Sequence, residues 1–333
     1  MRTRRFKSSS DPVPSARNSR ETGHRTQAAS QPPGHTSVLL HEAIEHLAIR
    51  PSDTVVDATL GGAGHARAMA ELLGEKGVFI GIDADEAAVK RAEAALKDLR
   101  KPEIHLVTAN FRNLPLELEK LGIARIDKAL FDLGWSGYQL SAGRGFSFQT
   151  DEPLLMTYAE HPGPDEITAG TIVNEWAEES IADIIFGWGE ERYARRIAKR
   201  IVERRAERPF RTARELADAI REAVPPAYRF GRIHPATRTF QALRIAVNDE
   251  MGALETGLAG AWERMREGGR IAVITFHSVE DRAVKRVMAG WETAGEGKRI
   301  VRSPIKPSRE ETLENPRARS AKLRVIEKII SHT

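Results

Sequence analysis

Residues 54–73 read TVVDATLGGAGHARAMAELL and are the most informative stretch of the chain. The β-branched residues at its start are typical of a short buried strand, and the run from Gly64 has the composition of a helix. A turn that contains three glycines joins the two, and Asp57 stands at the end of the strand. Small residues in such a turn allow backbone amide groups to come close to a ligand. The stretch therefore predicts a strand, a ligand-binding turn and a helix, which is the first unit of an α/β fold.

The alternation of strand and helix continues along the chain. GVFIGID, which ends at Asp83, predicts a second strand, and Asp85 is placed to cap a helix with one apolar stripe. Further strands are predicted at IHLVT, IDKALFDLG, GGRIAVITF and AKLRVIEKII. A helix capped by Ser278 with Asp281 should follow the fifth strand. Alternating strands and helices indicate a parallel sheet, which binds ligands beyond the carboxyl ends of its strands.

The long stretch between the fourth and fifth strands is helical and charged. It includes a T-x-x-E capping box at Thr212 and Glu215 and contains no further strand signal. We therefore predict one α/β domain made of residues 35–140 and 241–333. Residues 141–240 are predicted to form an all-helical insertion between its two halves.

The composition excludes several classes of protein. The 333 residues include no cysteine, which removes disulfides, thiolate metal sites, iron–sulfur clusters and a thiol nucleophile. No apolar run is long enough for a membrane span or a secretory signal, so we expect a cytoplasmic protein with no membrane partner. Residues 1–34 carry a net charge of +5 and few large apolar groups, which predicts a flexible basic tail, as a solvated extension or an RNA-binding arm.

The glycine turn favours a cationic ligand over a dinucleotide. The sequence D-x-T-x-G-x-x-G differs from the dinucleotide pattern G-x-G-x-x-G and adds Asp57, which would repel a pyrophosphate. The sulfonium and ammonium groups of S-adenosylmethionine suit such an acid. Asp83 lies twenty-six residues later at a strand end, where its two oxygens can accept hydrogen bonds from both ribose hydroxyls. A tight turn without a ligand is the alternative interpretation of Gly61 and its neighbours.

Several separated blocks of sequence then point to a known family. FDLGWSGYQL starts at Phe131 and is followed by RGFSF from Arg144. The other blocks are HTSVLLHEA from His35, NF at 110–111, GEERYARRIA from Gly189, HPATRTFQALRIAVNDE from His234, ITFHSVEDRAVK from Ile274 and NPRARSAKLR from Asn315. In their order along the chain, these blocks resemble the bacterial small-subunit ribosomal RNA cytosine-N4 methyltransferase family, the MraW or RsmH type.

The resemblance implies a fold, a reaction and a set of cofactor contacts. The expected fold is a Rossmann-like class I S-adenosylmethionine-dependent methyltransferase sheet, with the helical insertion recognising the substrate. The expected reaction is N4-methylation of a cytosine in 16S ribosomal RNA. The resemblance implies contacts to S-adenosylmethionine at Ala63, Gly64, His65, Asp83, Phe111, Asp132 and Gln139. Of these residues, only Phe111 and Gln139 are not indicated by the sequence pattern without the resemblance. Phe111 could instead be a core aromatic residue.

The chain departs from the family pattern at three places. The usual G-x-G-G-H becomes GGAGH, which moves a glycine but keeps every side chain small. The usual D-L-G-V-S-S-P-Q-L becomes DLGWSGYQL, and G-P-L-D-M-R-M becomes EPLLMTY with Leu155 and Thr157 in place of an acid and a base. We expect an altered loop in an enzyme that is still active, because Asp132, Gln139 and the FHS block are present.

The absence of cysteine narrows the chemistry of methyl transfer. Methylation of cytosine C5 uses covalent attack by a thiol, and radical methylation uses an iron–sulfur cluster, so neither fits. Direct displacement by the amine, without a covalent enzyme intermediate, is expected. Asp132 is our first candidate to accept an amine proton, with a structural strand-end carboxylate as the alternative. His277 and Ser278 are further catalytic candidates, although His277 could instead bond the backbone at a helix end.

Basic residues predict the surface that binds RNA. The candidates are Arg195, Lys199, Arg238, Arg244, Arg317, Arg319 and Lys322, with a solvated helix face as the alternative for Arg195 and Lys199. A reacting base must leave its stack, so we expect a cleft beside the sheet. The partner should be small-subunit ribosomal RNA within the 30S subunit. No metal cluster is visible in the sequence, and a dimer is compatible with it.

Two other functions compete with this interpretation. A DNA amino-methyltransferase usually carries [SDN]-P-P-[YFW] where this chain has DLGW from Asp132, so the sequence speaks against it. A non-catalytic ribosome assembly factor that binds RNA would explain the altered EPLLMTY segment.

Overall fold

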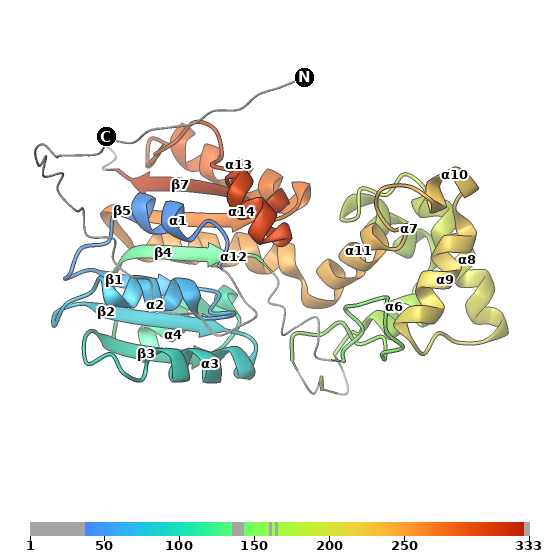
Figure 1. Ribbon diagram of the computed structural model, residues 1–333, viewed down its shortest axis with the longest axis horizontal. Coiled ribbons are helices and arrows are strands. Elements are labelled where there is room, and N and C mark those ends of the chain that lie inside the picture. Colours follow the sequence, from blue (N-terminus) through green and yellow to red (C-terminus); the bar gives the residue numbers. More distant parts are fainter. Residues whose placement is uncertain (1–36, 135–142, 160–161, 164–165, 330–333) are drawn as a thin grey trace, which may run out of the picture. The chain divides into compact units, whose positions relative to one another are not determined.

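A single mixed sheet organises the computed structural model, which describes residues 37–134, 143–159, 162–163 and 166–329. Its strands lie in the order β3-β2-β1-β4-β5-β7-β6 (Figure 1). In chain order they are β1 Thr54–Asp57, β2 Val78–Asp83, β3 Glu103–Thr108, β4 Ile126–Asp132, β5 Met265–Thr275, β6 Gly297–Arg299 and β7 Lys322–Lys328. The predicted basic tail, residues 1–34, lies outside the described residues.

The expectation of a parallel sheet is correct for five strands and wrong for the last two. Strands β3, β2, β1, β4 and β5 are all parallel to their neighbours. β7 runs antiparallel to both β5 and β6. Helix α13, Ser278–Thr293, carries the chain across to β6, and β7 then returns between β5 and β6. This arrangement confirms the Rossmann-like class I methyltransferase sheet expected from the sequence.

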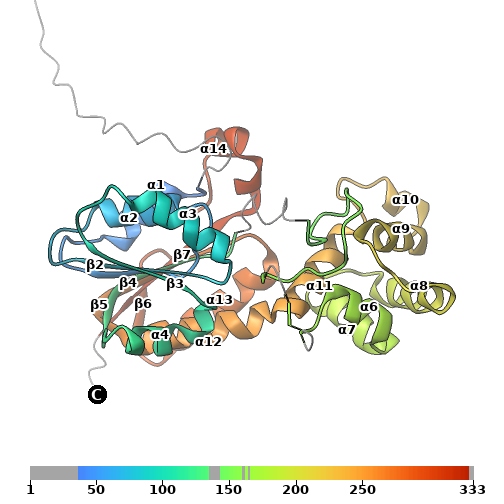
Figure 2. The ribbon, with the colours of Figure 1, turned by 90° about the horizontal axis from the view of Figure 1, so that it is seen from below.

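Alternating side chains along the strands fill two cores, one on each face of the sheet. Val55, for example, packs with helices α1, α2 and α3, whereas its neighbour Val56 packs with α4, α12 and α13. Figure 2 shows these two groups of helices on opposite sides of the strands. The helices outside the β4–β5 connection are α1 Leu40–Leu47, α2 Gly64–Glu71, α3 Glu86–Leu96, η1 Phe111–Asn113, α4 Leu114–Lys120, α13 Ser278–Thr293, α14 Arg309–Glu314 and η2 Pro316–Ser320.

The connection between β4 and β5 is helical, as predicted. It contains α6 Ala169–Glu175, α7 Glu178–Gly187, α8 Ala194–Glu207, α9 Ala213–Ala223, α10 Pro226–Arg229, α11 Thr237–Asn248 and α12 Glu250–Arg264. A third hydrophobic core extends from Phe146 to Leu243 and serves α6, α7, α8, α9 and α11. The division of the chain into domains at residues 140 and 240 stays a prediction.

Helix caps test the local predictions directly. Asp85 accepts a hydrogen bond from the backbone N–H of Ala87 and caps α3, and Thr212 forms the predicted capping box with Glu215 at the start of α9. The predicted cap of α13 is wrong by one residue, because His277 is the cap there. None of the helices in the described part of the chain is both long and apolar enough to cross a bilayer.

Gly81 in β2 lies where the sheet meets the glycine turn. A Cβ atom at this position would stand 2.5 Å from a methyl carbon of Leu60 and 2.7 Å from one of Leu106. Gly81→Ala should therefore lower the free energy of unfolding by about 1–3 kcal/mol through overpacking. Gly290→Ala is the matched control, because nothing lies within 4 Å of its Cβ position in α13. Urea denaturation should show the control equal to or more stable than the wild type, and equal stability of both variants would refute the packing argument.

Candidate active site at the carboxyl edge of the sheet

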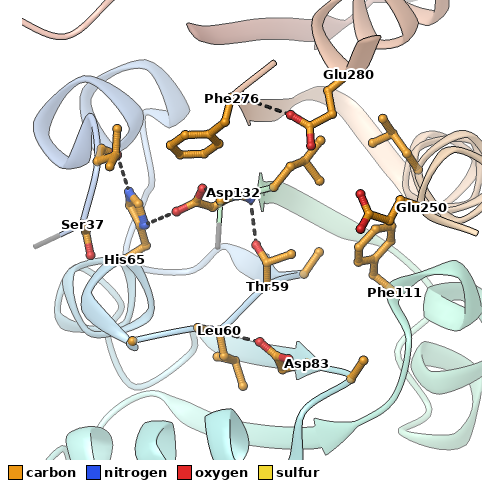
Figure 3. Close-up of a pocket in the computed structure, with 18 of the residues that line it drawn as sticks. Ser37, Thr59, Leu60, His65, Asp83, Phe111, Asp132, Glu250, Phe276 and Glu280 are labelled. Atoms are coloured by element: carbon orange, nitrogen blue, oxygen red, sulfur yellow. Dashed lines mark hydrogen bonds and ion pairs between the residues drawn. The ribbon is translucent and has the colours of Figure 1, made fainter. Parts of the chain in front are cut away.

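A cavity of about 660 Å³ opens at the carboxyl ends of the parallel strands. Each of these five strands delivers residues to its wall immediately after it ends, as the parallel arrangement requires. Examples in chain order are Gly61 after β1, Asp83 at the end of β2, Phe111 after β3, Asp132 at the end of β4 and Phe276 after β5. Figure 3 labels the last four of these residues. Residues of α12 and of the segment 314–320 complete the wall.

Acidic side chains accept backbone hydrogen bonds that shape the glycine turn. The Asp57 carboxylate lies under the turn, where its Oδ1 accepts the N–H of Thr59 at 3.1 Å. Gly61 and Ala63 both have positive φ angles, 48° and 64°, which cost an alanine about 1–2 kcal/mol. Gly61, Gly62 and Gly64 line the cavity, whereas Asp57 and Ala63 are buried and are not on its wall. Asp57 therefore helps to build the turn, and the expected cofactor contact at this residue stays a prediction.

Asp83 presents a carboxylate that has room for a ligand. Its Oδ2 accepts the N–H of Gly61 at 2.9 Å, and its Oδ1 accepts the N–H of Asp85 at 2.9 Å. Each oxygen of a carboxylate can accept two hydrogen bonds, so each retains capacity toward the cavity. Burial raises the pKa of Asp83, while the two backbone N–H groups act in the opposite direction.

Asp132 occupies the centre of the cavity, next to His65. Its backbone N–H donates to the Thr59 hydroxyl at 2.7 Å, and its Oδ1 accepts the N–H of Gly134 at 3.0 Å. Its Oδ2 lies 3.4 Å from Nδ1 of His65, whose Nε2 lies 3.1 Å from the carbonyl oxygen of Val38 (Figure 3). Burial lowers the pKa of His65, which favours the neutral ring. A neutral His65 that donates from Nε2 to Val38 has no proton on Nδ1, so the Asp132–His65 pair has a place for one more proton.

Phe111 packs in the core and also lines the cavity, so its contact with the cofactor stays a prediction. Its ring meets Phe131 edge to face with centroids 5.6 Å apart, and it packs so closely on α12 that a Cβ at Gly257 would stand 2.6 Å from it. The same residue lines the cavity. Gln139, the other contact implied only by the resemblance, lies outside the described residues.

His277 and Ser278 have structural partners at the start of α13, and their catalytic role stays a prediction. Neither residue lines the cavity. Nδ1 of His277 accepts the N–H of Glu280 and caps α13, and the Ser278 hydroxyl donates to the carboxylate of Glu190. Glu280, three residues after His277, faces the cavity instead. The capping-box rule pairs a cap with an acid three residues later, so the sequence contained the signal for Glu280 in a register shifted by one.

Arg244 belongs to the interior rather than to an RNA-binding surface. It is buried and holds Glu250 with two contacts, at 2.7 Å through Nε and at 2.9 Å through an Nη atom. Tyr158 donates its hydroxyl proton to the same Glu250 at 2.7 Å. One ligand atom each of Glu250, His277 and Glu280 lies within 4.8 Å of the others, a spacing that a metal ion could use. The guanidinium of Arg244 lies beside Glu250 and Glu280 and supplies the positive charge that a metal ion would otherwise bring to these acids.

The other basic candidates lie in different settings. Arg317 lines the cavity, and Arg319 is exposed two residues away. Lys322 is paired with Asp281 at 2.8 Å, and Arg238 donates to the carbonyl of Glu190 at 2.9 Å. Arg195 and Lys199 are exposed on α8.

The buried Asp57 predicts a distinctive dependence of stability on pH. Burial raises the pKa of Asp57 well above its usual range, and the nearby acids Asp132 and Asp83 raise it further. In the unfolded chain the pKa returns to about 3.9, so the folded state binds this proton more tightly. Its stabilising contribution is complete below pH 3.9 and decreases as the pH rises toward the folded pKa.

Asp57→Asn keeps an oxygen for the N–H of Thr59 and removes the charge. The free energy of unfolding of this variant minus that of the wild type should therefore increase between pH 4.5 and pH 8. Chemical denaturation at both pH values measures the difference. A difference that stays constant or decreases over this range would contradict a buried, proton-binding Asp57.

The wall of the cavity fits S-adenosylmethionine. Asp83, Asp132, Glu250 and Glu280 all line it, and a wall with this many carboxylates favours a cationic ligand. Asp83 retains acceptor capacity for the ribose, the glycine turn allows close approach of the backbone, and Phe111 offers an aromatic face. The cavity wall thus includes Asp83, Phe111 and Asp132, three of the residues that the sequence assigned to this methyl donor.

Comparison with known proteins identifies the family of this chain. The sequence matches the MraW methylase family over residues 33–329. It is 45% identical over 311 residues to "Ribosomal RNA small subunit methyltransferase H" of Clostridioides difficile (strain 630), which covers 89% of this chain and 99% of the relative. A protein of the same name from Deinococcus deserti is 46% identical over 299 residues, with coverage of 89% and 94%. The chain therefore belongs to the MraW methylase family, and S-adenosylmethionine is the cofactor of this methyltransferase.

Proposed function

We propose that this protein transfers a methyl group from S-adenosylmethionine directly to the N4 amine of a cytosine in 16S ribosomal RNA. The names of the relatives support a small-subunit ribosomal RNA as the substrate. The observation that carries the choice of an amine is the Asp132 carboxylate, which lines the cavity beside His65 in a chain without cysteine.

An amine nucleophile requires a proton acceptor, and the carboxylate of Asp132 is one. The lone pair of cytosine N4 is delocalised into the ring, so the amine becomes a nucleophile only when its protons are held by acceptors. As the N–CH₃ bond forms and the S–CH₃ bond breaks, the nitrogen gains positive charge and must release one proton. Asp132 accepts this proton, and Nδ1 of the neutral His65 lies 3.4 Å away to share it. The pair thus acts as a general base with a second group behind it.

The remaining residues hold the donor and the RNA. Asp83 accepts the ribose hydroxyls, while the amides of the glycine turn and the ring of Phe111 contact other parts of the donor. Arg317 at the cavity and the exposed Arg319 are best placed to meet the phosphates beside the target base. Arg195 and Lys199 are exposed on α8 in the helical segment, which we assign to recognition of RNA within the 30S subunit.

Asp83→Ala should weaken binding of S-adenosylmethionine about ten- to a hundredfold. The ribose hydroxyls would lose a charged acceptor, worth about 1.5–3 kcal/mol. Isothermal titration calorimetry measures the change. Asp98→Ala, on an exposed acid paired with Arg67 outside the cavity, is the control and should bind as the wild type does. Unchanged affinity in Asp83→Ala would remove this residue from the donor site.

Asp132→Asn should lower the rate of methyl transfer about 10²–10⁴-fold, the usual contribution of a general base. The fold should persist, because asparagine can still accept the N–H of Gly134 and its amide can donate to His65. Single-turnover transfer at saturating donor, together with thermal denaturation, separates the two effects. A folded variant with the wild-type rate would exclude Asp132 from catalysis.

Mass spectrometry of nucleosides tests the reaction itself. Purified protein, S-adenosylmethionine and either naked 16S ribosomal RNA or 30S subunits from cells that lack the gene should yield N4-methylcytidine, with more product from 30S subunits. Methyl groups on C5, or transfer to DNA instead of RNA, would contradict the proposal. Binding to 30S subunits without any transfer would favour a non-catalytic assembly factor.

A further inference from the structure

Glu280 is a buried acid that faces the cavity and has no role in the mechanism described so far. Only 2% of its surface is exposed, yet it is part of the cavity wall, and Figure 3 shows its side chain there together with Asp132. Its Oε2 accepts the backbone N–H of Phe276 at 2.8 Å and that of His277 at 3.3 Å. Two bonds fill the capacity of this oxygen, so any further acceptor capacity belongs to Oε1.

The hydrogen bonds of His277 determine what Oε1 receives. Nδ1 of His277 accepts the N–H of Glu280 at 3.3 Å, which places the ring proton on Nε2. Nε2 lies 2.9 Å from Oε1 of Glu280 and donates to it. His277 therefore fixes the orientation of the carboxylate and leaves one lone pair on Oε1 without a donor among the described residues.

The neighbouring arginine supports the charge of Glu280 without occupying this lone pair. An Nη atom of Arg244 lies 3.9 Å from Oε1, which is beyond a hydrogen bond. Arg244 pairs with Glu250, which Tyr158 also holds, and an Nη atom of Arg244 lies 3.2 Å from Nε2 of His277. The guanidinium thus lies near both carboxylates, at 2.7 Å from Glu250 and 3.9 Å from Glu280.

The geometry points to Glu280 as the acceptor for the second proton of the target amine. This inference rests on the proposed function, in which Asp132 takes the first. An exocyclic amine carries two N–H groups, and a buried N–H without an acceptor opposes binding. In the reaction Asp132 receives the proton, whereas Glu280 keeps its hydrogen bond to the second N–H and stabilises the positive charge on nitrogen. His277 and Arg244 act as positioning residues for Glu280.

Glu280→Gln provides the direct test. Glutamine can keep the backbone bonds to residues 276 and 277 through its oxygen but offers an N–H, instead of an acceptor, on the side that faces the amine. The turnover number on 30S subunits should decrease at least a hundredfold, while the dissociation constant for S-adenosylmethionine and the KM for RNA change less than threefold. Glu292→Gln, in the same helix and paired with Arg299, is the matched control and should retain wild-type turnover.

His277→Asn tests whether His277 positions Glu280. It also keeps the inference testable if the Glu280→Gln variant does not fold. Asparagine can still cap α13 through its side-chain oxygen but cannot reach Oε1, so turnover should decrease about tenfold with KM unchanged and the fold intact. A folded Glu280→Gln variant with wild-type turnover would overturn the inference. If Glu280→Gln does not fold, wild-type turnover in His277→Asn would overturn it instead. If the wild-type enzyme makes no N4-methylcytidine, the proposed function fails first, so the two failures are distinguishable.

Discussion

Three parallel strands each end in an aspartate at the same edge of the sheet. The electrostatic repulsion between these three carboxyl groups constrains the whole site. Asp57, Asp83 and Asp132 come from β1, β2 and β4, and β1 lies between the other two and pairs with both. The nearby Asp83 and Asp132 both raise the pKa of Asp57 in addition to burial. The sheet tolerates these acids because each accepts backbone N–H groups, from Thr59, from Gly61 and Asp85, and from Gly134.

This constraint explains why the cavity suits a cation and an amine. A neutral or anionic ligand would meet an edge that is already rich in negative charge, whereas a sulfonium relieves the repulsion. The cavity extends from the glycine turn to Glu250 and Glu280, so donor and acceptor can occupy one continuous space. The acids nearest the donor differ in role because their partners differ: Asp83 is held by backbone amides, and Asp132 stands against a neutral imidazole.

Much of this site could be predicted from the sequence, because parallel strands bring residues at strand ends together. Asp83, Asp132 and the glycines of the turn followed from that rule alone. Asp57 did not, because its position at a strand end does not reveal whether its side chain points into the cavity or beneath the turn. The sequence predicted an RNA-binding role for Arg244. Its actual partner, Glu250 in α12, could not be foreseen, because that pairing depends on how α11 and α12 meet. The three-residue strand β6 is too short to show a periodic pattern.

The most direct test of this account is a crystal structure of the protein with S-adenosylmethionine and cytidine monophosphate. The account predicts both ribose hydroxyls of the donor on the carboxylate of Asp83, the sulfonium methyl directed at the cytosine amine, and that amine between Asp132 and Glu280. A donor bound with its ribose away from β2, or a cytosine whose ring carbon instead of its amine faces the methyl group, would contradict it.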